Sequence, residues 1–129
     1  MAEALVTIDA SALLALVFGE EFHPGREALR GGLISAVNLA EAVTKMVDVG
    51  ATAEDAVADI DALGLDLELV AFDRDAAVQA AALRAETKRL GLSLADRACL
   101  SLARSRGIPA MTADRAWTKV EGIEVILVR

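Results

Sequence analysis

The sequence is poor in the residues that build several common kinds of protein. It holds one cysteine, one tryptophan, three phenylalanines and no tyrosine among 129 residues. The single cysteine, Cys99, excludes an internal disulfide and is typical of a reducing compartment, so we predict a cytoplasmic location. So few aromatic rings argue against a protein that binds bare bases by stacking them on its side chains.

Long hydrophobic runs are also missing from the sequence. No stretch of about 18 consecutive apolar residues occurs, which argues against a transmembrane helix and a membrane partner. The first residues, Met1 to Glu3, lack the basic start of a signal peptide, and Asp9 interrupts the apolar stretch that follows. We therefore expect neither a membrane span nor a signal peptide.

Basic residues are scarce in the first half of the chain. Residues 1–64 hold 3 Lys or Arg and 11 Asp or Glu, whereas residues 65–129 hold 10 and 9. The net charge of −7 argues against general adhesion to nucleic acid. From Arg84 to Lys119, however, eight residues are basic and only three are acidic. Such a stretch is either a solvated helix face or a surface that holds a phosphate backbone.

The order of the hydrophobic segments indicates the fold. Short apolar runs alternate with segments of helical spacing, which predicts one α/β domain over residues 1–129, with a mostly parallel five-stranded sheet flanked by helices. The predicted strands are Ala4–Ile8, Gly32–Ser35, Leu67–Phe72, Ile108–Thr112 and Ile123–Val128. The predicted helices begin at Ser11, near Pro24, after Ser35, at Thr52, at Asp73 and at Ser93, and the helix from Asp73 continues to Leu90. In the first of these helices, Ser11 is predicted to be the N-cap.

Four carboxylates lie where an open parallel sheet carries its sites, near the carboxyl ends of strands. Asp9 and Asp114 come just after predicted strands, and Glu41 and Asp96 lie on helices among apolar neighbours. A lone carboxylate in apolar surroundings is costly unless it is paired or bound to a metal. These groups therefore suggest a shared hard cation, Mg²⁺ or Mn²⁺, that activates water to attack a phosphodiester.

Asp96 also has a purely structural interpretation. Ser93 and Asp96 form the S-x-x-D pattern of a capping box, which satisfies free N–H groups at a helix start. Asp9 could likewise cap the helix that follows it. The residues alone leave both alternatives open.

Four stretches stand in an informative order: "VTIDASALLALVFGEE", "LISAVNLAEAVTKM", "LSLADRACLSLARSRGIPAMTADRAW" and "IEVILV". In these stretches the sequence resembles the PIN domain family, and specifically the VapC toxins of bacterial and archaeal toxin–antitoxin pairs. The resemblance runs from Val6 to the C-terminus and implies a PIN-like fold. It implies an Mg²⁺- or Mn²⁺-dependent ribonuclease with a set of metal-binding acids and a set of polar neighbours. The acids are Asp9, Glu41, Asp96 and Asp114, and the polar neighbours are Ser35, Asn38 and Thr112.

The resemblance also implies partners. It predicts a homodimer and a VapB-type antitoxin that wraps the toxin and blocks its active site, in a heterotetramer or a larger complex. Arg97 and Arg115 each follow a candidate acid and are candidates for contact with RNA phosphates.

Two other functions compete with a toxin. One is a PIN-domain nuclease that matures RNA or cuts DNA without an antitoxin. The other is a non-enzymatic α/β regulatory domain, such as a phosphoacceptor receiver. A receiver needs paired acids after the first strand and a lysine after the last strand, whereas this chain has only Asp9 at the first place and its last predicted strand ends the sequence.

Overall fold

All five predicted strands form, and they pair in one sheet. The computed structural model of the protein describes residues 5–129, so Ala4, the predicted start of the first strand, lies outside the described residues. The strands are β1 (Thr7–Ile8), β2 (Leu33–Ser35), β3 (Glu68–Val70), β4 (Ala110–Thr112) and β5 (Val125–Leu127). Their order is β3-β2-β1-β4-β5, and every pairing is parallel, as predicted.

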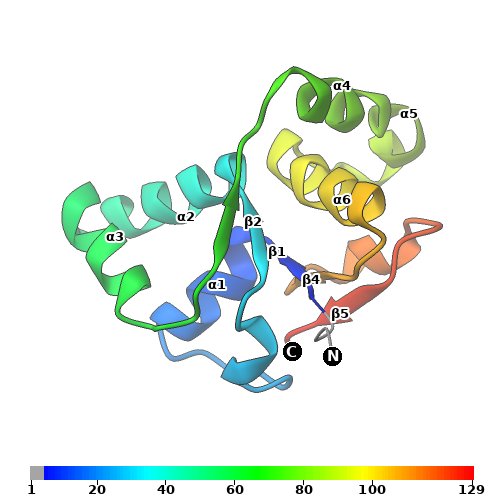
Figure 1. The fold of residues 1–129 in the computed structure, drawn as a ribbon. Coiled ribbons are helices and arrows are strands. Elements are labelled where there is room, and N and C mark those ends of the chain that lie inside the picture. Colours follow the sequence, from blue (N-terminus) through cyan, green and yellow to red (C-terminus); the bar gives the residue numbers. More distant parts are fainter. Residues whose placement is uncertain (1–4) are drawn as a thin grey trace.

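Helices cover both faces of this sheet (Figure 1). The α-helices are α1 (Ala10–Val17), α2 (Ala36–Asp48), α3 (Ala53–Asp61), α4 (Arg74–Ala82), α5 (Arg84–Thr87) and α6 (Leu94–Arg106). Three short 3-10 helices are η1 (Arg26–Leu29), η2 (Lys88–Leu90) and η3 (Arg115–Lys119). Helices α1 to α3 lie on one side of the sheet and α4 to α6 on the other (Figure 1). Across residues 5–129, no helix combines the length and the apolar character that a membrane crossing needs.

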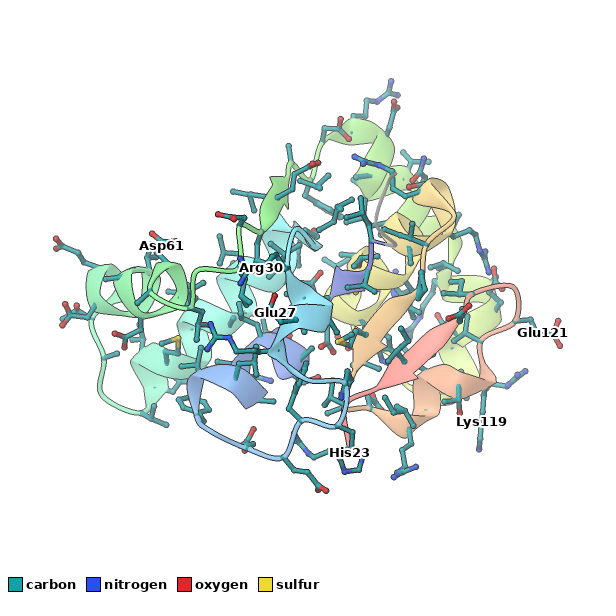
Figure 2. The ribbon with its side chains drawn as sticks, turned by 60° about the horizontal axis from the view of Figure 1, so that its bottom comes forward. His23, Glu27, Arg30, Asp61, Lys119 and Glu121 are labelled. Carbon is teal, nitrogen blue, oxygen red and sulfur yellow. The ribbon has the colours of Figure 1, made fainter. Side chains whose placement is uncertain are left out.

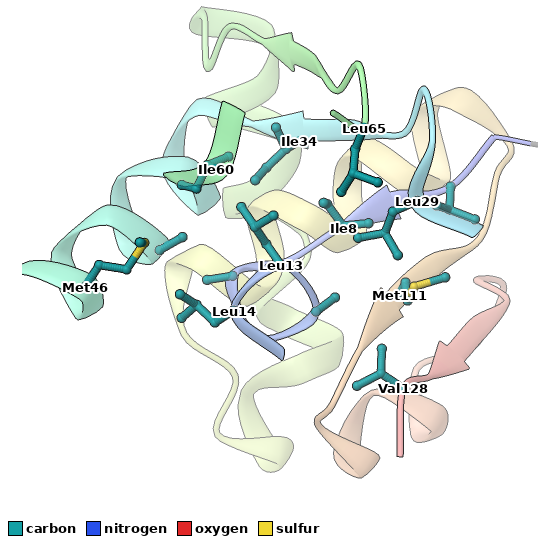
Figure 3. Packing of buried hydrophobic residues seen from close by; sticks show 14 of the residues in the cluster. Ile8, Leu13, Leu14, Leu29, Ile34, Met46, Ile60, Leu65, Met111 and Val128 are labelled. Carbon is teal, nitrogen blue, oxygen red and sulfur yellow. The ribbon is translucent and has the colours of Figure 1, made fainter. Parts of the chain in front are cut away.

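Side chains along each strand point alternately to the two faces of the sheet, and this divides the hydrophobic core in two. Ile8 pairs in register with Met111, and Ile34 continues this row on β2, towards the α1–α3 side (Figure 3). Ala110 belongs to the second cluster, where the fully buried Trp117 packs with residues of α6. Because neighbouring residues of a strand point to opposite faces, such short strands can still serve two cores.

The first helix begins two residues earlier than predicted. Asp9, not Ser11, is the N-cap of α1: its backbone is extended, and its carboxylate accepts a hydrogen bond from the N–H of Ala12. The prediction of Ser11 as the N-cap is therefore wrong. Asp9 is thus the single residue between the end of β1 and the first residue of α1.

The single long helix predicted from Asp73 to Leu90 is also wrong. It is divided at Leu83 into α4 and α5, and its last turn is the 3-10 helix η2. The hydroxyl of the buried Thr87 donates to the carbonyl oxygen of Leu83 at 2.7 Å. A threonine that bonds back one turn in this way competes with the helical hydrogen bonds and bends a helix.

Candidate active site at the carboxyl edge of the sheet

The strand order creates a topological switch point between β1 and β4. The chain passes from β1 to β2 and β3 on one side, and it then returns to place β4 on the other side of β1. In open parallel sheets, ligands bind beyond the carboxyl ends of the strands at such a point, because the connections diverge there. Asp9 directly follows β1 and Thr112 ends β4, so both lie at this edge.

Asp9 is buried and held by several hydrogen bonds. Its Oδ1 accepts from the N–H of Ala12 at 2.9 Å, and its Oδ2 accepts from the Thr112 hydroxyl at 2.6 Å. Only 5% of the residue is exposed. Burial raises the pKa of Asp9, the charge of Asp96 adds to this, and the hydrogen bonds from Thr112, Ala12 and Ser11 offset part of the rise. Among the described residues, no positive charge compensates the ionised carboxylate.

Ser11 is a site residue that the sequence analysis did not identify. Its Oγ lies 2.8 and 2.9 Å from the two oxygens of Asp9, and the hydroxyl proton is donated to this carboxylate. The same Oγ accepts a hydrogen bond from the N–H of Ala113 at 2.9 Å. Ser11 thus joins Asp9 to the segment that follows β4. The only signal in the sequence is a hydroxyl two residues after the acid at the strand end.

Asp96 fulfils the predicted capping box and also lies near Asp9. Its N–H donates to the Ser93 hydroxyl at 3.1 Å, and the N–H of Ser93 donates to Asp96 Oδ2 at 2.9 Å. The negative charge of Asp96 raises the pKa of Asp9, so the two carboxylates lie within electrostatic reach. The cap uses Oδ2 only, and no described residue forms a hydrogen bond with Oδ1. The capping and the site interpretations are therefore compatible.

Cys99 lies one helical turn after Asp96 and is fully buried in the core. Its Sγ lies 3.0 Å from the Thr7 hydroxyl. Burial raises the pKa of the Cys99 thiol well above its usual range, and the charges of Asp9 and Asp96 raise it further. The thiol is therefore protonated at neutral pH, which leaves it without the thiolate form that acts as a nucleophile.

Asp114 is linked to Asp9 through Thr112. The backbone N–H of Asp114 donates to the Thr112 hydroxyl oxygen at 3.0 Å, and that hydroxyl in turn donates to Asp9. The Asp114 side chain is exposed, and its Oδ1 caps η3 by accepting from the N–H of Ala116 at 2.9 Å. Asp114 thus lies two residues after the end of β4 and caps η3, and its part in a metal site stays a prediction.

Helix α2 carries the remaining candidates. Asn38 is fully buried and donates from Nδ2 to the carbonyl oxygen of Ala95 at 2.9 Å, which ties α2 to the start of α6 next to Asp96. Its Oδ1 is buried without a hydrogen-bond partner among the described residues. Glu41 follows one turn later, half-buried, and makes no hydrogen bond or ion pair within residues 5–129. Ser35 caps α2 by accepting from the N–H of Val37 at 3.2 Å.

The two arginines that are predicted to contact RNA both donate hydrogen bonds to backbone carbonyls, but they differ in exposure. Arg97 is half-buried and donates to the carbonyl oxygen of Ala80 at 3.0 Å, which joins α6 to α4. Arg115 is exposed, and it donates over a longer distance of 3.4 Å to the carbonyl oxygen of Arg129. Of the two, Arg115 has the more accessible guanidinium. A contact of either residue with RNA stays a prediction.

The donor chemistry of this edge fits a hard cation. The groups are carboxylates, hydroxyls and the unpartnered amide oxygen of Asn38, all oxygen donors of the kind that Mg²⁺ and Mn²⁺ prefer. Within residues 5–129, no three Asp, Glu, His or Cys side chains stand close enough together to hold a metal ion. The structure thus brings Asp9 and Asp96 near each other, and a site shared by all four acids stays a prediction.

A profile of the PIN domain family matches residues 6–123, from β1 to the approach to β5. The chain belongs to the PIN domain family. The parallel sheet flanked by helices is thus that of a PIN domain. A search of curated proteins found no match to the sequence.

Solved structures share the fold of this PIN domain. A chain of the DNA-bound VapBC complex of Salmonella typhimurium superposes with a TM-score of 0.76 at 22% identity, covering 98% of this chain and 100% of that one. VapC20 of Mycobacterium tuberculosis, described as a sarcin–ricin loop cleaving toxin, gives 0.73 at 20% identity, with 93% and 98% covered. VapBC-5 of the same organism gives 0.67 at 24% identity, with 98% and 99% covered.

Proposed function

We propose that the protein is a metal-dependent endoribonuclease toxin of the VapC type, which hydrolyses RNA phosphodiester bonds and is neutralised by a VapB-type antitoxin. The observation that carries this proposal is the Asp9 carboxylate. It is buried at the switch point of the sheet, oriented by two hydroxyls and close to the charge of Asp96. A protein that keeps two such carboxylates near each other without a cation of its own supports a bound metal ion as the missing charge.

Each residue of the site has a separate task in this proposal. Asp9 and Asp96 would hold the ion, with Glu41 and Asp114 as further ligands. A bound Mg²⁺ or Mn²⁺ supplies a water nucleophile of lowered pKa and stabilises charge on the leaving oxygen. The hydroxyls of Ser11 and Thr112 donate to Asp9 and fix the direction of its oxygens. Asn38 fixes the start of α6, and so the position of Asp96, through its hydrogen bond to Ala95.

The nuclease activity is tested on the purified protein, freed of any bound partner. Structured RNA and DNA of matching sequence are incubated with Mg²⁺, Mn²⁺ or EDTA. We expect RNA to be cut with either metal, to stay intact in EDTA, and to stay intact with Asp9→Asn. The matched control is Asp59→Asn, because Asp59 is an exposed acid of α3 whose side chain makes no hydrogen bond within residues 5–129. Intact RNA in every arm, with a folded protein, contradicts the proposal, and cleavage of DNA alone favours the nuclease without an antitoxin.

The proposed partner is a small antitoxin. Two of the structures with this fold are VapBC complexes, and the net charge of −8 over residues 1–64 complements a basic protein segment. The test is co-expression with any small gene directly upstream, followed by co-purification and an RNA cleavage assay. We expect a complex that does not cut RNA, and light scattering of the free toxin should give a homodimer. A toxin of this kind acts on RNA in the cytoplasm, and the free thiol of Cys99 fits that location.

A further inference from the structure

The basic residues between Arg84 and Lys119 fall into two groups. Four of the eight are tied to the fold. Arg84, Arg97 and Arg115 donate to backbone carbonyls, and Arg104 pairs with Glu86. The other four form no hydrogen bond or ion pair within residues 5–129, and they are Lys88, Arg89, Arg106 and Lys119. All four side chains are exposed, so their charges are available to a ligand.

Three of these four cations line one cavity. It has a volume of about 620 Å³ and is lined by Ala85, Glu86, Lys88, Arg89, Lys119 and Glu121. We call this cavity the basic groove. One wall comes from α5 and η2, and the other comes from the end of η3 and the loop before β5, where Lys119 and Glu121 project from the surface (Figure 2). Cations from segments thirty residues apart in the chain thus meet across a single opening.

Arg104 ties the two walls of the basic groove together. Its guanidinium donates to both carboxylate oxygens of Glu86, at 2.8 and 3.1 Å, and also to the backbone carbonyl of Glu121 at 3.1 Å. This arginine therefore joins the two walls and compensates the charge of Glu86. Among the residues that line the groove, three positive charges then remain, and the Glu121 carboxylate is the one negative charge that is not paired. The groove is a preformed site with an excess of positive charge.

We infer that the basic groove binds the phosphate backbone of the RNA substrate, an inference that rests on the proposed function. Phosphate is the ligand that lysines and arginines recognise without base specificity. The 3-10 helix η3 begins at its cap Asp114, near the carboxyl end of β4, and ends at Lys119, and its five residues span about 10 Å at the usual 3-10 rise. Because β5 runs parallel to β4, the loop that follows η3 lies towards the amino ends of these strands, so the groove stands one short element away from Asp114 along the surface. Because the chain carries a net charge of −7, phosphate binding should concentrate at this local excess of cations.

The test measures binding separately from cleavage. A fluorescent single-stranded RNA is titrated with the protein in EDTA at several salt concentrations. In the groove variant, Lys88, Arg89 and Lys119 are all replaced by alanine. In the charge-matched control, three exposed and unpaired cations elsewhere are replaced, namely Lys45, Arg74 and Arg106.

We expect the groove variant to bind RNA at least roughly tenfold more weakly at 0.1 M salt. The slope of log K against log salt should fall by about 2, which is about 0.7 for each lost phosphate contact. The control should change the RNA affinity and the salt slope little. Glu121→Gln, which removes a negative charge from the groove, should strengthen RNA binding. With metal present, the groove variant should cut RNA with a raised KM and an unchanged kcat.

The inference is overturned if the groove variant and the control lose the same amount of RNA affinity. It is also overturned if neither variant changes RNA binding. Tighter binding of poly-glutamate than of RNA, lost in the groove variant, overturns it in favour of an acidic protein partner. The binding assay is independent of catalysis. A protein that binds RNA in the groove and cuts none therefore contradicts the proposed function, whereas a protein that cuts RNA equally well without the groove contradicts only this inference.

Discussion

The Thr112 hydroxyl donates a 2.6 Å hydrogen bond to the Asp9 carboxylate, across 103 positions of sequence. The bond joins the ends of β1 and β4, the two strands on either side of the switch point. Ser11 completes the arrangement, because its hydroxyl oxygen contacts both Asp9 oxygens and accepts from the backbone of Ala113. The position of Asp9 is therefore fixed by the fold, and its burial has a cost that substitutions can reveal.

Asp9→Asn should remove RNA cleavage and stabilise the fold at neutral pH. The pKa of Asp9 is raised in the folded protein, so the folded state holds its proton more tightly than the unfolded state does. The contribution of Asp9 is therefore most favourable below the ordinary pKa of about 3.9 and is lost as the pH rises through the raised value. Asparagine does not titrate, and its amide oxygen can still accept from Ala12.

The measurement for this substitution is a series of thermal melts across the acidic and neutral range. The difference in Tm between Asp9→Asn and the natural protein should grow with pH from about 4 upward and then level off. Asp59→Asn, at an exposed position, should show no such trend. A variant that melts lower than the natural protein at neutral pH contradicts the assignment of a buried, uncompensated charge.

Ser11→Ala should shift the acid limb of the cleavage rate profile to higher pH. The Ser11 hydroxyl lowers the pKa of Asp9 by donating to its charged form, so its loss raises that pKa further. More acid is then present in the protonated form, which cannot hold a cation. The substitution also removes the acceptor for Ala113 N–H, which should cost about 1–2 kcal/mol of stability.

The pH profile separates a positioning role from a purely structural one. Ser105→Ala is the matched control, because that hydroxyl is exposed and donates only to the Leu102 carbonyl. It should leave the profile unchanged. If Ser11→Ala lowers the rate equally at every pH, the hydroxyl stabilises the fold without tuning Asp9.

Local patterns predicted part of this site. The Ser93–Asp96 capping box depends on residues three positions apart, and its two hydrogen bonds form as predicted. The place of Asp9 at a strand end follows from one buried strand and the general geometry of parallel sheets. Such features need little tertiary information, so they can be predicted from one sequence.

The features that the sequence did not reveal depend on tertiary contacts. The Asn38 amide donates to the Ala95 carbonyl 57 positions away, a contact that depends on how α2 packs on α6. Ser11 was interpreted as a cap because serine is a common N-cap, but the neighbouring Asp9 has taken that position. The break at Leu83 likewise coincides with the hydrogen bond from the buried Thr87 hydroxyl to the Leu83 carbonyl, a contact that no hydrophobic pattern reveals.

Divalent metal should raise the Tm of the natural protein. The repulsion between Asp9 and Asp96 in the folded state is relieved when a cation binds between them, and the unfolded chain has no such site. Ligand at a hundred times its Kd stabilises a fold by about 2.7 kcal/mol. Thermal melts with Mg²⁺ or Mn²⁺ against EDTA measure this effect.

The same melts on variants locate the metal ligands. Asp9→Asn and Asp96→Asn should lose the metal-dependent rise in Tm, whereas Asp59→Asn should keep it. Glu41→Gln and Asp114→Asn test whether the other two predicted acids contribute. A rise in Tm that persists in both Asp9→Asn and Asp96→Asn contradicts a metal site at this edge.

The two functions of the Asp96 carboxylate can be separated by a pair of substitutions. Ser93→Ala removes the hydroxyl that accepts from Asp96 N–H, which should cost about 1 kcal/mol of stability and leave most RNA cleavage intact. Asp96→Asn keeps an amide oxygen that can accept from Ser93 N–H, so the fold should be nearly as stable while cleavage is lost. Urea unfolding and single-turnover cleavage of both variants give the comparison. An Asp96→Asn protein that unfolds more easily yet still cuts RNA assigns the carboxylate to the helix cap alone.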